Sequence, residues 1–241
     1  MTVAEIDLHV HSKYSYDSLL KPEKIVKGAK RKGLSGIAIT DHGTIQGGLS
    51  AKKYDIEDFI TITGTEIRTE IGDIIGLFLN EEIKSNEIRG VIDEIKDQGG
   101  LVILPHPFRG HDWKKIDNDL FEKIDAIEGY NARTGMEKNR QAQKFAKEHG
   151  LPITAGSDAH FYGEIGLART FIKDVSSEEG IRKSIARGRT RINGVEAPLY
   201  FRAVSRVLTD IKTGNWYKLP HTLLSMSIKY AIHGKRQINN R

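Results

Sequence analysis

Seven short apolar runs recur along this chain of 241 residues, and segments of helical length separate most of them. Glycine, proline or a polar residue bounds each run, as is typical of β-strands. Strands that alternate with helices form βα units, which build a buried, parallel sheet covered by helices. We therefore predict an α/β fold, and the pattern favours a barrel. The predicted strands are residues 5–8, 36–39, 59–62, 101–104, 124–127, 151–154 and 167–172.

Four of the intervening segments carry the end signals of helices. The first begins at Pro22, where proline suits the first helical turn, and ends at Gly33. Residues 70–80 instead predict a β-hairpin that turns near Gly72. Glycine directly follows each of the other three predicted helices and commonly closes a helix. These helices are residues 85–98, 136–149 and 177–187.

The composition excludes several classes of protein. The chain has no cysteine, so disulfides, thiolate zinc sites and cysteine-based catalysis are ruled out. The longest stretch without Asp, Glu, Lys or Arg is residues 98–108, only 11 residues. A membrane-spanning helix needs about 20 apolar residues, so we expect no membrane span. The N-terminus also lacks the basic and apolar regions of a signal peptide, and we expect a cytoplasmic protein.

Basic residues gather at the C-terminal end of the chain. Residues 198–241 hold eight Lys or Arg and one acid, whereas residues 1–197 hold 29 bases and 31 acids. We expect a barrel domain over residues 1–197 and a basic, mainly helical extension over residues 198–241. The extension either binds nucleic acid through sequence-independent electrostatics or packs its apolar side on the barrel. Val204, Leu208 and Ile211 lie at helical spacing, which favours packing.

Ionisable residues follow six of the predicted strands, at the point where each strand ends. In an α/β barrel the carboxyl ends of the strands form one face, and that face carries the chemistry. Five histidines, several carboxylates and two arginines would therefore converge, although they lie far apart in the sequence. In chain order they are Asp7, His9, His11, Asp17, Asp41, His42, Glu66, His106, Arg109, Glu128, Arg133, Asp158 and His160.

The spacing of these residues predicts metal ligands. His9 and His11 lie two residues apart on a strand, so both imidazoles point to the same side, and Asp158 and His160 repeat this spacing. Imidazole and carboxylate ligands without thiolate suit zinc, manganese or iron. A single histidine is more often a core or loop residue, but burying this many ionisable groups together is costly unless a cation compensates. We therefore predict a metal cluster, in which Asp41 either orients a ligand or only caps a turn.

Several motifs in order resemble those of a known superfamily. The series DLHVHS, TDHGT, the glutamate of GTE, PHP and SDAH is similar to the motifs of the polymerase and histidinol phosphatase (PHP) superfamily. The resemblance covers about residues 4–195, and the ordered set is far more specific than any one motif. It implies a distorted (β/α)7, TIM-like barrel that holds two or three divalent metal ions (Zn, Mn or Fe) and hydrolyses phosphoesters.

The resemblance also implies which residues hold the metals. In several relatives with three metals a further histidine follows the fifth strand, where this chain has Asn131. This difference leaves the second metal with fewer strong ligands. By position, the first metal would take His9, His11 and Asp158. The second would take His106, with Glu66 as the bridge between the first and the second. The third would take Asp17, His42 and His160.

The reaction implied by the resemblance is an in-line attack on phosphorus by a hydroxide that bridges the metals, without a covalent intermediate. Clustered cations lower the pKa of bound water and neutralise charge on the phosphoryl oxygens. His160 or Asp158 would assist proton transfer. Arg109 and Arg133 are candidates for contacting phosphate through their forked donors, and the alternative for both is an ion pair with acidic side chains.

The substrate remains open at the level of sequence. We expect a small phosphomonoester or a nucleotide, including nucleoside bisphosphates. A 5′–3′ exonuclease guided by the basic extension and a histidinol-phosphate phosphatase are the enzymatic alternatives. A metal-stabilised binding or accessory module without turnover is the alternative from another class. The complete ligand set argues against the module, because an inactive domain can lose ligands without penalty.

Overall fold

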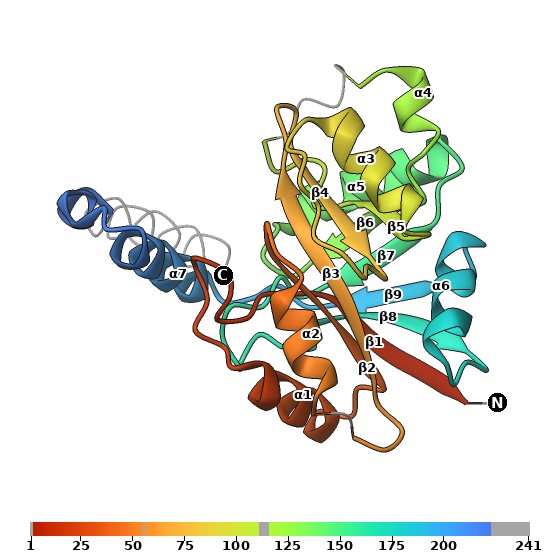
Figure 1. Ribbon diagram of the computed structural model, residues 1–241, viewed down its shortest axis with the longest axis horizontal. Coiled ribbons are helices and arrows are strands. Elements are labelled where there is room, and N and C mark those ends of the chain that lie inside the picture. Colours follow the sequence, from red (N-terminus) through yellow and green to blue (C-terminus); the bar gives the residue numbers. More distant parts are fainter. Residues whose placement is uncertain (1, 55, 111–115, 223–241) are drawn as a thin grey trace, which may run out of the picture.

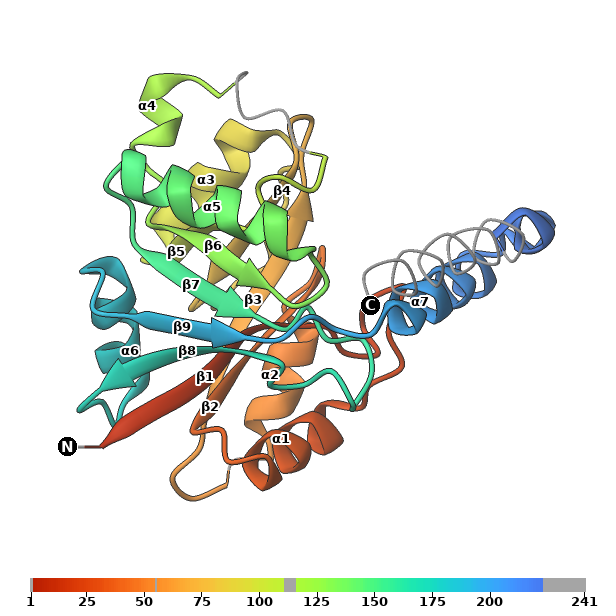
Figure 2. The same ribbon diagram turned by 180° about the vertical axis from the view of Figure 1, so that it is seen from behind.

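The computed structural model describes residues 2–54, 56–110 and 116–222. Within these residues a sheet of nine strands curves through the centre of the molecule, and helices lie around its outer side (Figure 1 and Figure 2). The strands are β1 (Val3–Val10), β2 (Gly36–His42), β3 (Ile60–Arg68), β4 (Asp73–Leu77), β5 (Leu101–Leu104), β6 (Ala126–Asn131), β7 (Ile153–Gly156), β8 (Ala168–Lys173) and β9 (Arg191–Gly194).

The helices that lie against the barrel turn an apolar face toward the sheet. α1 (Pro22–Arg31) begins with proline in its first turn and buries Ile25 and Val26 in a cluster with Ile37 and Ile39 of β2. Within the described ranges, none of the helices combines the length and the hydrophobicity needed to cross a lipid bilayer. The remaining helices are α2 (Gln46–Lys52), α3 (Ile88–Asp97), α4 (Asn118–Phe121), α5 (Met136–Glu148), α6 (Glu178–Ala186), α7 (Leu199–Lys212) and the short 3-10 helix η2 (Trp216–Lys218).

The sheet nearly closes on itself where the chain after β7 returns to β1. In the order β7-β6-β5-β4-β3-β2-β1-β8-β9, β7 is an edge strand. Just beyond it, the backbone N–H of Asp158 donates to the carbonyl of His9 at 2.8 Å, and the N–H of His11 donates to that of Ala159 at 2.9 Å. Gly156 permits this approach, because a Cβ there would lie 2.2 Å from the Cβ of His9. This barrel-like sheet confirms the predicted α/β fold.

The sheet predicted to be parallel is mixed. β4 pairs antiparallel with β3 and β5, and β8 pairs antiparallel with β1 and β9. The predicted hairpin turn is present, since the N–H of Thr69 donates to the carbonyl of Gly72 at 2.9 Å. Its first arm, however, is the end of β3 rather than residues 70–71. β9 was not predicted because only Ile192 of its four residues is a large apolar side chain.

The four predicted helices are confirmed as α1, α3, α5 and α6, with ends within three residues of the predicted positions. Ser177 marks the start of α6, where its hydroxyl accepts the backbone N–H of Gly180. α2 and α4 were not predicted. They span seven and four residues, too few to show the apolar period of a helix.

The apolar core fills the amino-terminal end of the barrel and leaves the opposite end to polar side chains. Ile6 of β1, Ile62 of β3 and Ile103 of β5 belong to one buried cluster with Ile181 and Ile185 of α6. α6 therefore covers the end of the barrel at which β1 begins, as Figure 1 shows. Buried ionisable residues instead lie where the parallel strands end.

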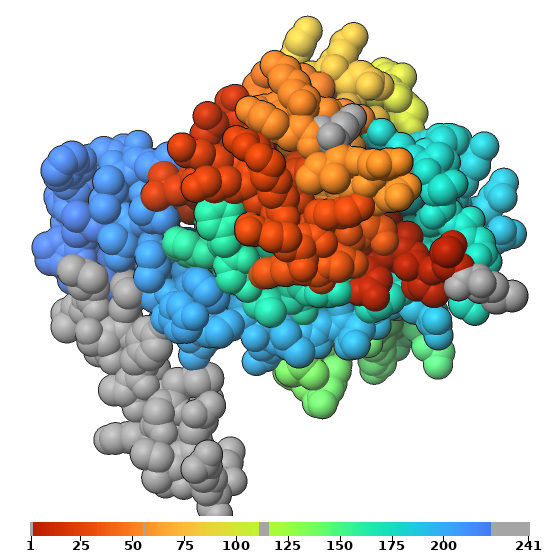
Figure 3. Space-filling model, turned by 90° about the horizontal axis from the view of Figure 1, so that it is seen from below, coloured from red at the N-terminus to blue at the C-terminus, as the bar shows by residue number. Residues whose placement is uncertain are grey.

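α7 projects from the barrel beside the segment that follows β1 (Figure 3). Its helical structure agrees with the predicted C-terminal extension, and Phe201 packs on Phe161 with ring centroids 5.3 Å apart. Val204 and Ile211 are nevertheless 42% and 46% exposed, so the apolar side is only partly packed on the barrel. Four of the eight basic residues of the extension lie in 223–241, outside the described residues. The domain boundary after residue 197 stays a prediction.

Candidate metal centre

All eight predicted metal ligands lie together at the carboxyl-terminal end of the barrel. Their imidazole nitrogens and carboxylate oxygens approach one another within 4.8 Å in overlapping sets. Six of the eight residues are buried, and Asp17 and His42 are partly exposed. One set, His11, Asp17, His42 and His160, is called the outer group here. The other four ligands, His9, Glu66, His106 and Asp158, are distributed over the remaining sets and are together called the inner group.

The outer group centres on Asp17, in the loop after β1. Its Oδ2 lies 2.7 Å from Nε2 of His160 and 3.4 Å from Nε2 of His42. The ring of His11 lies between these two histidines, with centroids 4.5 Å and 4.4 Å away. The resemblance implied a site of Asp17, His42 and His160, and the structure brings these residues together and adds His11.

The inner group is built at the ends of β1 and β3 and in the segments after β5 and β7. Nε2 of His106 lies 3.0 Å from Oε1 of Glu66, and Nε2 of His9 lies 3.7 Å from Oδ1 of Asp158. His106 and Asp158 both have positive φ, 27° and 54°, in a region that residues other than glycine rarely occupy. Backbone strain of this kind costs about 1–3 kcal/mol and clusters at functional sites.

Glu66 contacts both groups. Its Oε2 lies 3.3 Å from Nε2 of His11 and 3.3 Å from Nδ1 of His42, while Oε1 faces His106. Burial alone would raise the pKa of this carboxyl, but the surrounding histidines, His9 and His42 first, hold its pKa well below the usual range. Glu66 is therefore an ionised carboxylate in the position expected of the bridging ligand.

The histidines of the cluster differ in how readily they hold a proton. Burial, together with the neighbouring His11, lowers the pKa of His160 to about 4. For His11 the effect of burial is outweighed by Asp158 and Glu66, which raise its pKa to about 9. Metal binding requires neutral imidazole, so a cation at this position would displace the proton of His11.

The donor chemistry of the cluster fits a divalent metal. Its atoms are imidazole nitrogens and carboxylate oxygens, the ligands of zinc, manganese and non-haem iron. Oδ1 of Asp17 is buried and has no hydrogen-bond partner among the residues that the structure describes. Such an atom is costly to bury, and a cation held by the outer group would compensate it. The buried clusters therefore indicate that this chain binds metal.

Two polar residues of β6 hold the inner group in place. Oε1 of Glu128 lies 2.9 Å from Nδ1 of His9, and its Oε2 accepts the backbone N–H of His106 at 2.8 Å. The amide nitrogen of Asn131 donates to Glu128 at 3.0 Å and to Asp158 at 3.3 Å, so Asn131 orients carboxylates. Glu128 was not predicted to have a role, although it lies near the end of its strand as Glu66 does.

Asp41 supports the outer group through a serine. Its Oδ1 accepts the hydroxyl of Ser15 at 3.0 Å. That hydroxyl oxygen lies 3.1 Å from Nδ1 of His11 and accepts the backbone N–H of His42 at 2.9 Å. Asp41 also accepts from the backbone N–H and hydroxyl of Ser12. Of the two predicted roles, these contacts favour the orienting one.

The two candidate arginines occupy different surroundings. Arg109 donates to Oδ2 of Asp158 at 2.7 Å and is 35% exposed, beside the cluster. Arg133 is buried and donates to both carboxylate oxygens of Glu164, at 2.7 Å and 2.9 Å, and to the hydroxyl of Ser205 at 2.8 Å. Its alternative role, an ion pair, is therefore the one seen here. A phosphate contact by Arg133 would require this buried pair to open.

A pocket of about 690 Å³ opens beside the cluster. The ring of Tyr16 stacks on that of His42 at its wall, with centroids 4.6 Å apart and an interplanar angle of 12°. The volume lies within the range of small-molecule sites, roughly 300–1,000 Å³. Both metal groups reach the pocket, since its lining includes Tyr16, Asp17, His42, Glu66 and Arg109.

Comparisons with known proteins agree with this geometry. A family model described as PHP-associated matches residues 136–190. An uncharacterized protein of Methanocaldococcus jannaschii is 42% identical over 157 residues, which cover 59% of this chain and 91% of that protein. A protein of Caldicellulosiruptor saccharolyticus, named a probable phosphatase, is 29% identical over 203 residues, which cover 67% of this chain and 82% of that protein.

A solved structure shares the fold. It is a two-domain protein from Bacteroides vulgatus that is described as containing a predicted PHP-like metal-dependent phosphoesterase. The two folds match with a TM-score of 0.71 at 22% sequence identity, over 80% of this chain. The match covers 65% of the Bacteroides protein, so this chain spans less than two thirds of it. The chain belongs to the PHP-domain metal-dependent phosphoesterase superfamily.

Proposed function

We propose that this phosphoesterase hydrolyses a small phosphomonoester or a nucleotide, nucleoside bisphosphates included. The observation that carries the proposal is the convergence of eight imidazole and carboxylate ligands beside one pocket of about 690 Å³, which Asp17, His42 and Glu66 line. The similarity to a protein named a probable phosphatase supports the same class of reaction.

The inner and outer groups together would hold two or three divalent ions, with zinc, manganese or iron as the candidates. When bound, such ions activate water and neutralise charge on the phosphoryl oxygens. Both ring nitrogens of His160 are engaged, Nδ1 with the carbonyl of Asp158 at 2.8 Å and Nε2 with Asp17 at 2.7 Å. This supports a ligand role for His160 over a role in proton transfer.

Arg109 is the residue that we assign to the phosphate. It lines the pocket together with Asp17, His42 and Glu66, and its guanidinium is partly exposed there. One of its nitrogens donates to Asp158, and among the described residues the other donors of the fork have no hydrogen-bond partner, which leaves them for two oxygens of a phosphoryl group. Arg109 would thus orient the phosphoryl group over the metal ligands.

The contacts of the basic extension support a small substrate over a nucleic-acid strand. Arg202 donates to the backbone carbonyl of Arg133 at 2.8 Å, and Lys212 donates to three backbone carbonyls of the loop after β1. Two of the four basic residues in its described part are therefore engaged within the protein. An exonuclease guide would need these side chains to bind backbone phosphates.

The test combines metal analysis with a substrate panel. The full chain is assayed on phosphomonoesters, nucleotides, nucleoside bisphosphates, histidinol phosphate and a single-stranded oligonucleotide, before and after chelation. We expect two or three metals per chain and monoester hydrolysis that chelation removes and manganese or zinc restores. Preferred oligonucleotide cleavage with steeply salt-dependent binding would point to the exonuclease. Metal without turnover on any substrate would favour a binding module, and a chain without metal would refute the proposal.

A further inference from the structure

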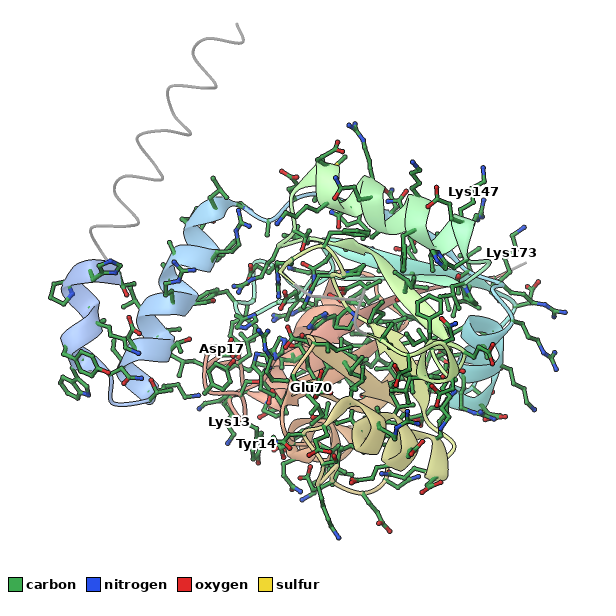
Figure 4. All side chains as sticks on the ribbon, turned by 90° about the horizontal axis from the view of Figure 1, so that it is seen from above. Lys13, Tyr14, Asp17, Glu70, Lys147 and Lys173 are labelled. Carbon is green, nitrogen blue, oxygen red and sulfur yellow. The ribbon has the colours of Figure 1, made fainter. Side chains whose placement is uncertain are left out.

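The last turn of α7 contacts the loop that carries Asp17. The ammonium of Lys212 donates to the backbone carbonyls of Lys13, Ser15 and Ser18, at 3.3, 2.5 and 2.9 Å. An ammonium has three donors, so this loop engages all of them. Figure 4 shows Lys13 and Asp17 on the side of the barrel that faces α7.

The middle of α7 contacts the segment that carries His160. The hydroxyl of Ser205 accepts from Nη2 of Arg133, and the same guanidinium is paired with Glu164. Glu164 in turn accepts the backbone N–H of His160 at 2.9 Å. A continuous series of polar contacts therefore runs from α7 to the backbone of a second outer ligand.

We propose that α7 braces the outer metal group and that Lys212 is its principal positioning residue. Asp17 lies in residues 11–21, all of them described, which form neither helix nor strand. The position of its carboxylate therefore depends on contacts made by the loop, and Lys212 supplies three of them. Groups that orient metal ligands without touching the metal typically contribute about 10–100-fold in metal affinity. This inference rests on the proposed metal centre.

The positive charge of Lys212, taken alone, would change metal affinity in the direction opposite to the brace. A cation near a divalent metal repels it, so removal of the charge alone would strengthen metal binding. Removal of the brace would weaken metal binding, because the loop of Asp17 loses three hydrogen bonds. The direction of the change therefore separates the brace from a simple charge effect.

The experiment measures successive dissociation constants for Mn²⁺ and Zn²⁺ by competition with a chelator on the full chain. Asp17→Asn first identifies which constant belongs to the outer group. Lys212→Met should raise the dissociation constant of the outer group about tenfold or more and leave the other constants unchanged. Lys212→Arg retains several donors and should recover most of the affinity.

Arg206→Met is the matched control. Arg206 lies on the same helix, is exposed, and makes no side-chain hydrogen bond or ion pair with the described part of the chain. It should bind metal as the wild type does, or slightly more tightly. Thermal unfolding of each metal-free variant checks that Lys212→Met is folded.

Unchanged or tighter binding in folded Lys212→Met would overturn the brace, as would an equal loss in Arg206→Met. A wild-type chain that binds no metal would overturn the brace and the proposed function together. If the wild type binds metal and Asp17→Asn weakens metal binding by the outer group but Lys212→Met does not, the brace alone is overturned.

Discussion

The inner and outer metal groups are held by different parts of the fold. The inner ligands His9 and Glu66 lie on β1 and β3, and neither is more than 2% exposed. Glu128, on β6, contacts two inner ligands directly. In the outer group, the side chains of Asp17 and His42 are 13% and 20% exposed. Their support comes from a serine hydroxyl and, as we propose, from α7.

The difference separates ligands that the sheet holds in position from ligands whose position depends on loop contacts. Strands paired on both sides leave His9 and Glu66 little freedom, so the positions of these two inner ligands are set before metal binds. The loop of Asp17 must be ordered by contacts with hydroxyls and with α7, which cost less to break than a sheet. The outer group also faces the pocket, where Tyr16 and His42 form its wall. We therefore expect tight metal binding inside and weaker, exchangeable binding outside.

The largest effect should come from the residue that both groups share. Glu66→Gln keeps the size of the side chain and removes a charge that faces His9, His11, His42 and His106. Loss of metal from both groups removes several kcal/mol of transition-state stabilisation, equivalent to about 1,000-fold or more in kcat/KM. Metal content and the kcat/KM for the preferred substrate measure these losses. Glu137→Gln, at the surface, is the control, and full metal content in Glu66→Gln would contradict the shared role.

Arg133→Met should produce the largest loss of stability. It leaves the buried Glu164 without its counter-ion, which typically costs about 3–5 kcal/mol in the free energy of unfolding. Burial raises the pKa of Glu164 above its ordinary value, so this carboxyl takes up a proton more readily in the folded state as the pH falls. The loss should therefore be greatest at neutral pH and smaller in acid, where Glu164 takes up a proton. Urea denaturation of the wild type, Arg133→Met and the exposed control Arg140→Met, at neutral and at acid pH, tests this prediction. A loss of stability in Arg140→Met equal to that in Arg133→Met would contradict it.

Glu128→Gln should weaken the inner group selectively. The change removes the carboxylate that lies against Nδ1 of His9 and accepts the backbone N–H of His106. Outer-sphere carboxylates of this kind are worth about 10–100-fold in metal affinity. Chelator competition should show that loss in the metal dissociation constants of the inner group, which are those that Asp17→Asn leaves unchanged. A loss confined to the outer group would contradict the selective role of Glu128. Glu122→Gln, at an exposed position, serves as the control.

The ligands were predictable because each lies next to a local signal. An apolar run marks the strand, and the polar residues at its end, such as His9 and His11, lie on one side by the alternation of the strand. The supports were not predictable in this way. Arg133 pairs with Glu164, 31 residues away, and with Ser205, 72 residues away. No local pattern specifies such partners, since only the closed barrel brings them together.

The directions of the strands show the same limit. The turn after Arg68 was visible as a hairpin signal, but the sequence did not reveal that β3 was its first arm. β8 is an apolar run like the others, and its antiparallel pairing with β1 depends on the path of residues 157–167, which also carry Asp158 and His160. This segment crosses the carboxyl-terminal end of the barrel and feeds β8 in the reverse direction. Two metal ligands and the reversal that makes β8 antiparallel to β1 thus depend on one segment.

The smallest expected effect tests whether the pocket wall supports the outer group. Tyr16→Leu removes the ring that stacks on His42, a contact worth about 0.5–1.5 kcal/mol, equivalent to about 2- to 12-fold in affinity. His42 would then rotate more freely, so the outer constant should weaken while the inner constants stay fixed. Tyr14→Leu is the matched control, because Tyr14 lies in the same loop, is similarly exposed and stacks on no histidine of the described chain. An equal loss in Tyr14→Leu would mean that the loop itself, rather than the stacked ring, sets the affinity of the outer group.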